Sequence, residues 1–141
     1  MTLDEATEFI HRMLAADDVA GLVSLYVFGS VAENRAHQDS DLDVGVLLDR
    51  ARYPDEASRF HQRLLLSLTF SRIGGPEADV VILNDAPPLL GRAIVTRGKR
   101  ILCRDEELDH AYVRDIQLMA ADIEPWLQRM WKIKLEAMER R

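Results

Sequence analysis

Short apolar segments rich in Val, Leu and Ile alternate along this chain with longer segments of helical character, and this alternation limits the folds it can adopt. Four of the short segments have the length and composition of strands: LVSLYVF at 22–28, DLDVGVLL at 41–48, ADVVIL at 78–83 and KRILC at 99–103. Because helical segments lie between them, the sequence predicts an α/β (α+β) fold, in which helices flank a small mixed sheet of about four strands.

Four helices are expected around this sheet, from the spacing of apolar residues and from prolines and glycines at the helix ends. They span 3–16, 54–72, the stretch from Pro87 or Pro88 to Gly98, and the chain from Asp105 onward. The second has five apolar residues available for its buried face: Phe60, Leu64, Leu65, Leu68 and Phe70. Residues 31–38 are mostly polar and leave room for one helical turn, and Pro125 is expected to break or kink the last helix.

The length of 141 residues fits one domain over 1–141, with a C-terminal helical region at 105–141. No run of 18 apolar residues occurs, and the first residues, MTLDEATEF, are acidic where a secretion signal is basic. We therefore expect a cytoplasmic protein that does not enter a membrane. The single cysteine excludes an intrachain disulfide, and the net charge of −6 argues against a direct nucleic-acid partner.

Paired carboxylates occupy the start of the second predicted strand. Side chains alternate between the two faces of a strand, so Asp41 and Asp43 point to the same face, while the intervening Leu42 points to the core. Two adjacent carboxylates repel each other unless a cation lies between them, and oxygen ligands of this kind suit Mg²⁺. Asp79 opens a later strand, and if the two strands are neighbours, three carboxylates could hold two metal ions for phosphoryl or nucleotidyl transfer.

Gly29 and Ser30 end the first predicted strand, where a glycine lets the backbone approach a phosphate closely. A helical turn after them would direct free N–H groups at that phosphate, and Arg35 could neutralise further negative charge. His37, in the same loop, could lie near a nucleotide. Each motif alone also has an ordinary explanation, Gly-Ser as a turn and Asp-x-Asp as a solvated strand end, so the joint pattern carries the functional prediction.

Gly29-Ser30, ten residues and Asp41-Leu42-Asp43 resemble the GS-x10-DxD signature of minimal nucleotidyltransferases in the DNA polymerase β superfamily. The stretches FGSVAENRAHQDSDLDVGVLL and ADVVILNDAPPLL are similar in particular to the MNT antitoxins of HEPN/MNT toxin–antitoxin modules. The resemblance implies that Gly29 and Ser30 hold the triphosphate and that Asp41, Asp43 and Asp79 are catalytic and bind two Mg²⁺ ions. The role of Arg35 rests on its position alone.

The same resemblance implies an activity: transfer of AMP from ATP to a hydroxyl, of a tyrosine, on a cognate HEPN ribonuclease toxin, which silences it within a hetero-oligomer. Two alternatives stay open at this point, a non-catalytic antitoxin that acts by binding and an antibiotic-type adenylyltransferase acting on a small molecule. The C-terminal stretch 126–141 is basic and rich in Trp and Met. It could pack on its own domain, bind a partner or lie on a membrane surface.

Overall fold

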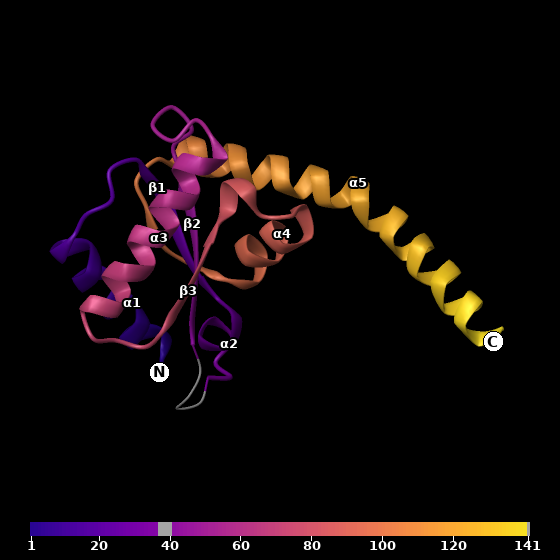
Figure 1. The fold of residues 1–141 in the computed structure, drawn as a ribbon, viewed down its shortest axis with the longest axis horizontal. Helices are drawn as coiled ribbons and strands as arrows, with labels where there is room; N and C mark the ends of the chain where they lie inside the picture. The colour runs from indigo at the N-terminus through magenta and orange to yellow at the C-terminus, as the bar shows by residue number, and fades with distance from the viewer. Residues whose placement is uncertain (37–40, 141) are drawn as a thin grey trace.

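A computed structural model describes residues 1–36 and 41–140, which form a four-stranded mixed sheet between two layers of helices (Figure 1). The strands are β1 (Leu22–Phe28), β2 (Leu42–Leu48), β3 (Ala78–Ile82) and β4 (Lys99–Cys103), in the order β3-β2-β1-β4. β1 runs antiparallel to both β2 and β4, whereas β2 and β3 are parallel. The predicted fold class is confirmed.

The helices divide between the two faces of the sheet. α1 (Leu3–Ala16) and α3 (Glu56–Arg72) cover one face, and α4 (Pro88–Arg97) and α5 (Glu106–Glu139) cover the other. A short helix, α2 (Gly29–Ala32), follows β1 directly, and a 3-10 turn, η1 (Leu83–Asp85), follows β3. Side-chain oxygens of Thr2, Asp55 and Asp105 accept hydrogen bonds from the first turns of α1, α3 and α5, which fixes where these helices begin.

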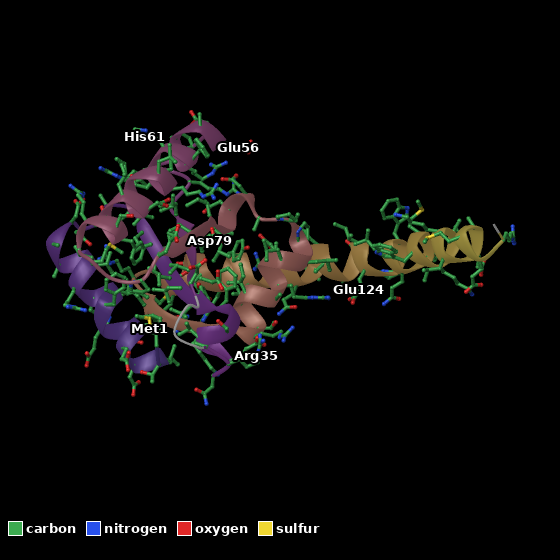
Figure 2. The ribbon with its side chains drawn as sticks, turned by 60° about the horizontal axis from the view of Figure 1, so that its bottom comes forward. Met1, Arg35, Glu56, His61, Asp79 and Glu124 are labelled. Atoms are coloured by element: carbon green, nitrogen blue, oxygen red, sulfur yellow. The ribbon has the colours of Figure 1, made fainter. Side chains whose placement is uncertain are left out.

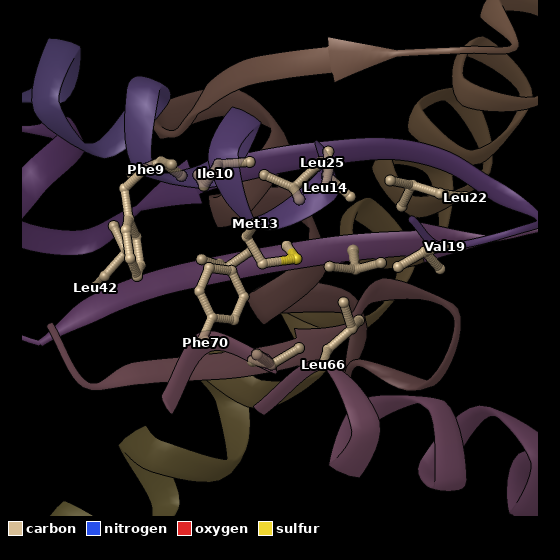
Figure 3. Close-up of a cluster of buried hydrophobic side chains, with 14 of the residues drawn as sticks. Phe9, Ile10, Met13, Leu14, Val19, Leu22, Leu25, Leu42, Leu66 and Phe70 are labelled. Atoms are coloured by element: carbon tan, nitrogen blue, oxygen red, sulfur yellow. The ribbon is translucent and has the colours of Figure 1, made fainter. Parts of the chain in front are cut away.

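The larger core lies between the sheet and the α1/α3 layer (Figure 3). Leu42, Val44 and Val46 of β2 are fully buried in it, as the alternation of side chains along the strand predicts. Phe9 of α1 and Phe70 of α3 meet over the sheet, with ring centroids 5.6 Å apart. A smaller core on the opposite face contains Leu47, Leu83 and Ile94, among others, so β2 has apolar neighbours on both sides.

The predicted buried face of α3 is wrong in four of its five residues. Phe70 is buried, together with Leu66, but the others are exposed: Phe60, Leu64, Leu65 and Leu68. The buried face instead includes Arg59, whose guanidinium pairs with Asp85 at 2.9 Å and donates to the Tyr53 carbonyl. A charged side chain can be buried when it is paired and hydrogen-bonded in this way, and a polarity pattern does not reveal that.

α5 is a continuous helix of 34 residues, and Pro125 does not break it. Its first half packs on α4, where Arg92 and Glu124 pair at 2.9 Å. The remainder, residues 126–139, projects away from the rest of the protein (Figure 1), and we call it the arm. A proline removes one backbone hydrogen bond, but strong helix formers such as Leu127, Met130 and Leu135 continue the helix beyond it.

The arm does not pack on its own domain. Its large apolar side chains are exposed, among them Trp126, Met130, Trp131 and Ile133. The possibility that this segment packs on its own domain is therefore excluded for the residues of the arm that the structure describes. Within those residues, no helix is long and apolar enough to cross a membrane.

A buried carboxylate joins α5 to the sheet. Asp109, which is almost fully buried, accepts hydrogen bonds from Ser24 Oγ at 2.6 Å and Tyr26 Oη at 2.8 Å. Arg100 of β4 pairs with its other oxygen at 3.0 Å. Burial and the bond to Asp109 raise the pKa of the Tyr26 phenol, so that it stays a donor. The network fixes the first turn of α5 against β1 and β4.

Asp109→Ala should lower the free energy of unfolding by about 2–4 kcal/mol, because the buried hydroxyls of Ser24 and Tyr26 lose their acceptor. Denaturant titration followed by far-ultraviolet circular dichroism measures the change. Asp122→Ala, at an exposed position of the same helix, is the matched control and should change stability by less than about 0.5 kcal/mol. Equal effects of the two substitutions would contradict a stabilising role for the network.

Candidate active site

The sheet brings together two of the three acids singled out from the sequence. Asp43 of β2 and Asp79 of β3 are direct neighbours in the parallel register. Both lie on the face opposite the larger core, because Val44 and Val80 point into that core. Asp41 precedes β2 by one residue and is exposed. Figure 2 shows Asp79 between Arg35 and Glu56 in that view.

The acids interact electrostatically. Burial raises the pKa of the Asp43 carboxyl, and the negative charges of Asp79 and Asp41 raise it further. Asp43 is half-buried, whereas Asp41 and Asp79 are exposed. Asp43 is therefore the acid at the centre of the group, and the two exposed acids flank it.

Gly29 is placed directly against Asp43. Its φ of +72° lies in the left-handed region that favours glycine, and a Cβ atom there would overlap Asp43 Oδ2. The sequence predicted a glycine for close approach of a phosphate, and the structure adds a second reason, the neighbouring carboxylate. The helical turn itself begins earlier than predicted: α2 spans Gly29–Ala32 and includes Ser30, and Asn34, also at positive φ, follows it.

Two arginines share a hollow with Gly29. Arg35 and Arg97 each form an ion pair with Glu33, and all three line a hollow of about 220 Å³ together with Gly29. The two arginines lower the pKa of the Glu33 carboxyl. Sequence reasoning found Arg35 but missed Arg97, because Arg97 comes from the end of α4 and only the fold brings it to Gly29. The expectation for His37 lies outside the described residues.

The three acids offer carboxylate oxygens, the donors that Mg²⁺ prefers. Within residues 1–36 and 41–140, no three acidic, His or Cys side chains are grouped closely enough to ligate one ion as they stand. Asp41 and Asp79 are both exposed, and Asp43 lies beside Asp79 in the sheet. The donor set therefore fits a divalent cation in the kind of ligand it offers.

A family model described as polymerase beta, nucleotidyltransferase matches residues 10–107, which include Gly29, Ser30 and the three acids. The chain belongs to this family. As a polymerase β-type nucleotidyltransferase it has the expected sheet, the Gly-Ser turn after β1 and the acidic pair Asp41 and Asp43 at the start of β2. The family resemblance drawn from the sequence is confirmed.

Individual proteins and solved structures are also similar to this chain. The chain is 31% identical over 99 residues to the protein adenylyltransferase MntA of Shewanella oneidensis, an alignment that covers 67% of this chain and 66%, just under two-thirds, of that protein. A solved toxin–antitoxin structure with AMP-PNP matches with a TM-score of 0.67 at 23% identity, over 89% of this chain and 98% of the other. A structure of tri-AMPylated Shewanella oneidensis HEPN toxin in complex with MNT antitoxin matches with a TM-score of 0.62 at 21% identity, over 91% and 98%.

Gly29→Ala should destabilise the protein more than Gly74→Ala, although both glycines have the same φ of +72°. At Gly74 an added Cβ meets open space, so only the backbone cost of about 1–2 kcal/mol applies. At Gly29 the overlap with Asp43 adds roughly 1–3 kcal/mol. Denaturant titration of both variants gives the comparison, and equal losses of stability would show that Asp43 does not occupy the space beside Gly29.

Asp43→Asn should raise the free energy of unfolding at neutral pH. Because the folded-state pKa is raised, the folded protein loses stability as pH rises from the ordinary value of 3.8 through the raised value, and a neutral side chain avoids this loss. The gain over the wild type should therefore shrink as pH falls from 7 toward 4. Thermal melts across this range, with exposed Asp122→Asn as the control, measure the trend, and a pH-independent difference would be inconsistent with it.

Proposed function

We propose that this protein is an antitoxin nucleotidyltransferase, which transfers AMP from ATP to a tyrosine hydroxyl of a cognate HEPN ribonuclease toxin and so neutralises it. The observation that carries the proposal is the pairing of Asp43 with Asp79 beside Gly29, in a chain 31% identical to a protein adenylyltransferase. ATP as the donor agrees with a cytoplasmic location, and the toxin would be its partner in a hetero-oligomer. A relative's complex with an AMPylated HEPN toxin supports this choice of acceptor protein.

Gly29 and Ser30 would bind the triphosphate. They form the first turn of α2, where, among the described residues, no side chain caps the helix, so their backbone N–H groups are available to phosphate oxygens. Ser30 adds a hydroxyl donor. Arg35 and Arg97 line a hollow with Gly29 and would neutralise the β- and γ-phosphates. Both arginines now pair with Glu33, and they would leave it to bind the triphosphate, which carries more negative charge.

Asp41, Asp43 and Asp79 would hold Mg²⁺, with two ions the expected number, and the metal would supply charge neutralisation at the reacting phosphate. The acceptor hydroxyl oxygen forms a bond to the α-phosphorus, the bond from that phosphorus to the bridging oxygen breaks, and pyrophosphate leaves. Asp79 is exposed on the outermost strand, where an incoming hydroxyl would meet it first, and we assign it as acceptor of the hydroxyl proton.

Neutralisation by binding alone is the second candidate, and the arm favours it. Trp, Met and Arg are enriched in protein interfaces, and the arm exposes Trp126, Met130 and Trp131 with Arg129 beside them. The two modes are compatible, since a toxin must be bound before it can be modified. What separates them is whether binding without transfer is enough to protect a cell.

The double substitution Asp41→Asn with Asp43→Asn should lower AMP transfer at least about a hundredfold while the fold remains intact, since it removes proposed metal ligands and relieves repulsion. Intact-mass spectrometry of the HEPN protein after incubation with ATP and Mg²⁺ measures the transfer. Asp122→Asn is the control and should retain full transfer. Undiminished transfer by the double variant would contradict the assigned site.

The same double variant separates the two modes of neutralisation in cells. If it still binds the HEPN toxin but no longer protects, modification is what neutralises the toxin. Full protection by a variant that cannot transfer AMP would mean that binding suffices and that the proposed transfer has no part in protection.

A further inference from the structure

A second hollow lies at the free edge of the sheet, next to the acids. Its volume is about 250 Å³, and its apolar walls are Phe60 of α3, Val81 of β3, and Pro87 and Leu90 at the start of α4. Its lining also has charged residues: Glu56, Arg63 and Asp85. Leu90 also lines the hollow beside Gly29, so the two hollows lie on either side of one side chain. Binding of the triphosphate beside Gly29 leaves this second hollow without a role.

This second hollow, the edge hollow, adjoins the face of the sheet that carries Asp43 and Asp79. Val81 follows Asp79 by two residues on the same strand, so the two side chains point to the same face, about 6–7 Å apart. Val81 packs toward the smaller core on that face, as Phe28 does next to Gly29. A group that rests against Val81 is therefore within one side-chain length of the Asp79 carboxylate.

The geometry of displacement at phosphorus fixes which reactant approaches from this side. The attacking oxygen and the leaving group lie on opposite sides of the α-phosphate, roughly in line. With the β- and γ-phosphates held at Gly29, Arg35 and Arg97, pyrophosphate leaves toward α2. The acceptor hydroxyl must then approach from the opposite side, which is the β3 edge where Asp79 and the hollow lie.

The size and lining of the hollow suit a single aromatic side chain. A volume of about 250 Å³ has room for one phenol ring. Phe60 is 52% exposed and Leu90 39% exposed, which leaves apolar surface on two opposing helices for a ring to cover. Arg63 Nε donates to the Val80 carbonyl at 2.8 Å and holds its guanidinium at the rim.

The surface beside the hollow offers a contact for the partner polypeptide that carries this aromatic side chain. Leu64 and Leu68 follow Phe60 along one side of α3 at helical spacing, and both are exposed. An acceptor that is a residue of a folded protein needs such a flanking contact, whereas a free small molecule does not. Phe60, Leu64 and Leu68 are three of the five residues that the sequence suggested for the buried face of this helix, and all three are exposed.

We propose that the hollow between α3, β3 and α4 is the acceptor subsite, which holds the phenol ring of the tyrosine to be modified, with the α3 stripe of Phe60, Leu64 and Leu68 contacting the surrounding surface of the HEPN partner. The proposal rests on the AMP transfer proposed above. Phe60, which lines only the edge hollow, then determines which acceptor is used and does not determine which nucleotide is used.

The test is steady-state transfer kinetics of Phe60→Ala, with the purified HEPN protein and ATP varied separately. Phe60 lines the edge hollow and not the hollow beside Gly29, so its loss should lower kcat/KM for the HEPN protein roughly tenfold or more and leave the KM for ATP unchanged. Leu118→Ala removes a 61% exposed apolar side chain of α5 and should alter neither value. Because Phe60 is half-exposed, the melting temperature of Phe60→Ala should stay close to that of the wild type, and Phe60→Leu should retain part of the efficiency.

The remaining outcomes each overturn the proposal in a recognisable way. A raised KM for ATP with an unchanged value for the HEPN protein would assign the hollow to the nucleoside. Unchanged values for both substrates would remove the hollow from the reaction while leaving the transfer itself intact. Absence of any transfer by the wild-type protein would overturn the proposed function, and the acceptor subsite with it.

Discussion

Parallel pairing between β2 and β3 puts Asp43 directly beside Asp79, and the hydrophobic core keeps that register in place. A shift of β3 by one residue would turn Val80 toward water and Asp79 into the core. An unpaired carboxylate in an apolar interior costs several kcal/mol, so the packing that stabilises the domain also fixes the position of the two acids. The geometry of the site is thus a consequence of the alternation along two strands.

Negative charge is concentrated where the proposed substrate is itself an anion. The protein carries a net charge of −6, and burial together with the charges of Asp79 and Asp41 raises the pKa of its central acid, Asp43. Positive charge lies nearby: Arg35 and Arg97 both pair with Glu33 and line one hollow with Gly29, the residue against which Asp43 lies. In the proposed site, the acids would bind cations and the arginines would bind phosphates, with Gly29 adjoining both groups.

Much of the fold could be predicted because each strand can be recognised from its own short stretch of sequence. The apolar runs, the Gly-Ser turn and the Asp-x-Asp pair are short-range patterns, and the neighbouring position of Asp79 followed once β2 and β3 were taken to pair. The face of α3 was mistaken because that helix has apolar residues on more than one side, and the decisive partner of buried Arg59 is Asp85, 26 residues away. Arg97 was missed for the same reason, since its proximity to Gly29 exists only in three dimensions.

The helix preference of the residues after Pro125 also explains why α5 continues past it, where the sequence predicted a break or kink. A proline ends a helix when the residues after it prefer another conformation, but here they favour a helix and face only water. Arg92 pairs with Glu124 just before the proline, which ties α5 to α4 at the base of the arm. The exposed arm and the exposed stripe of α3 are both apolar surfaces that the fold leaves uncovered.

The arm has a consequence for spectroscopy. The chain contains two tryptophans, Trp126 and Trp131, and both lie on the arm with more than half of each side chain exposed. Their indole emission reports on the solvent around the arm and carries almost no signal from the sheet or from either core. A fluorescence trace of this protein follows what covers the arm, whereas the integrity of the catalytic domain has to be read from backbone circular dichroism.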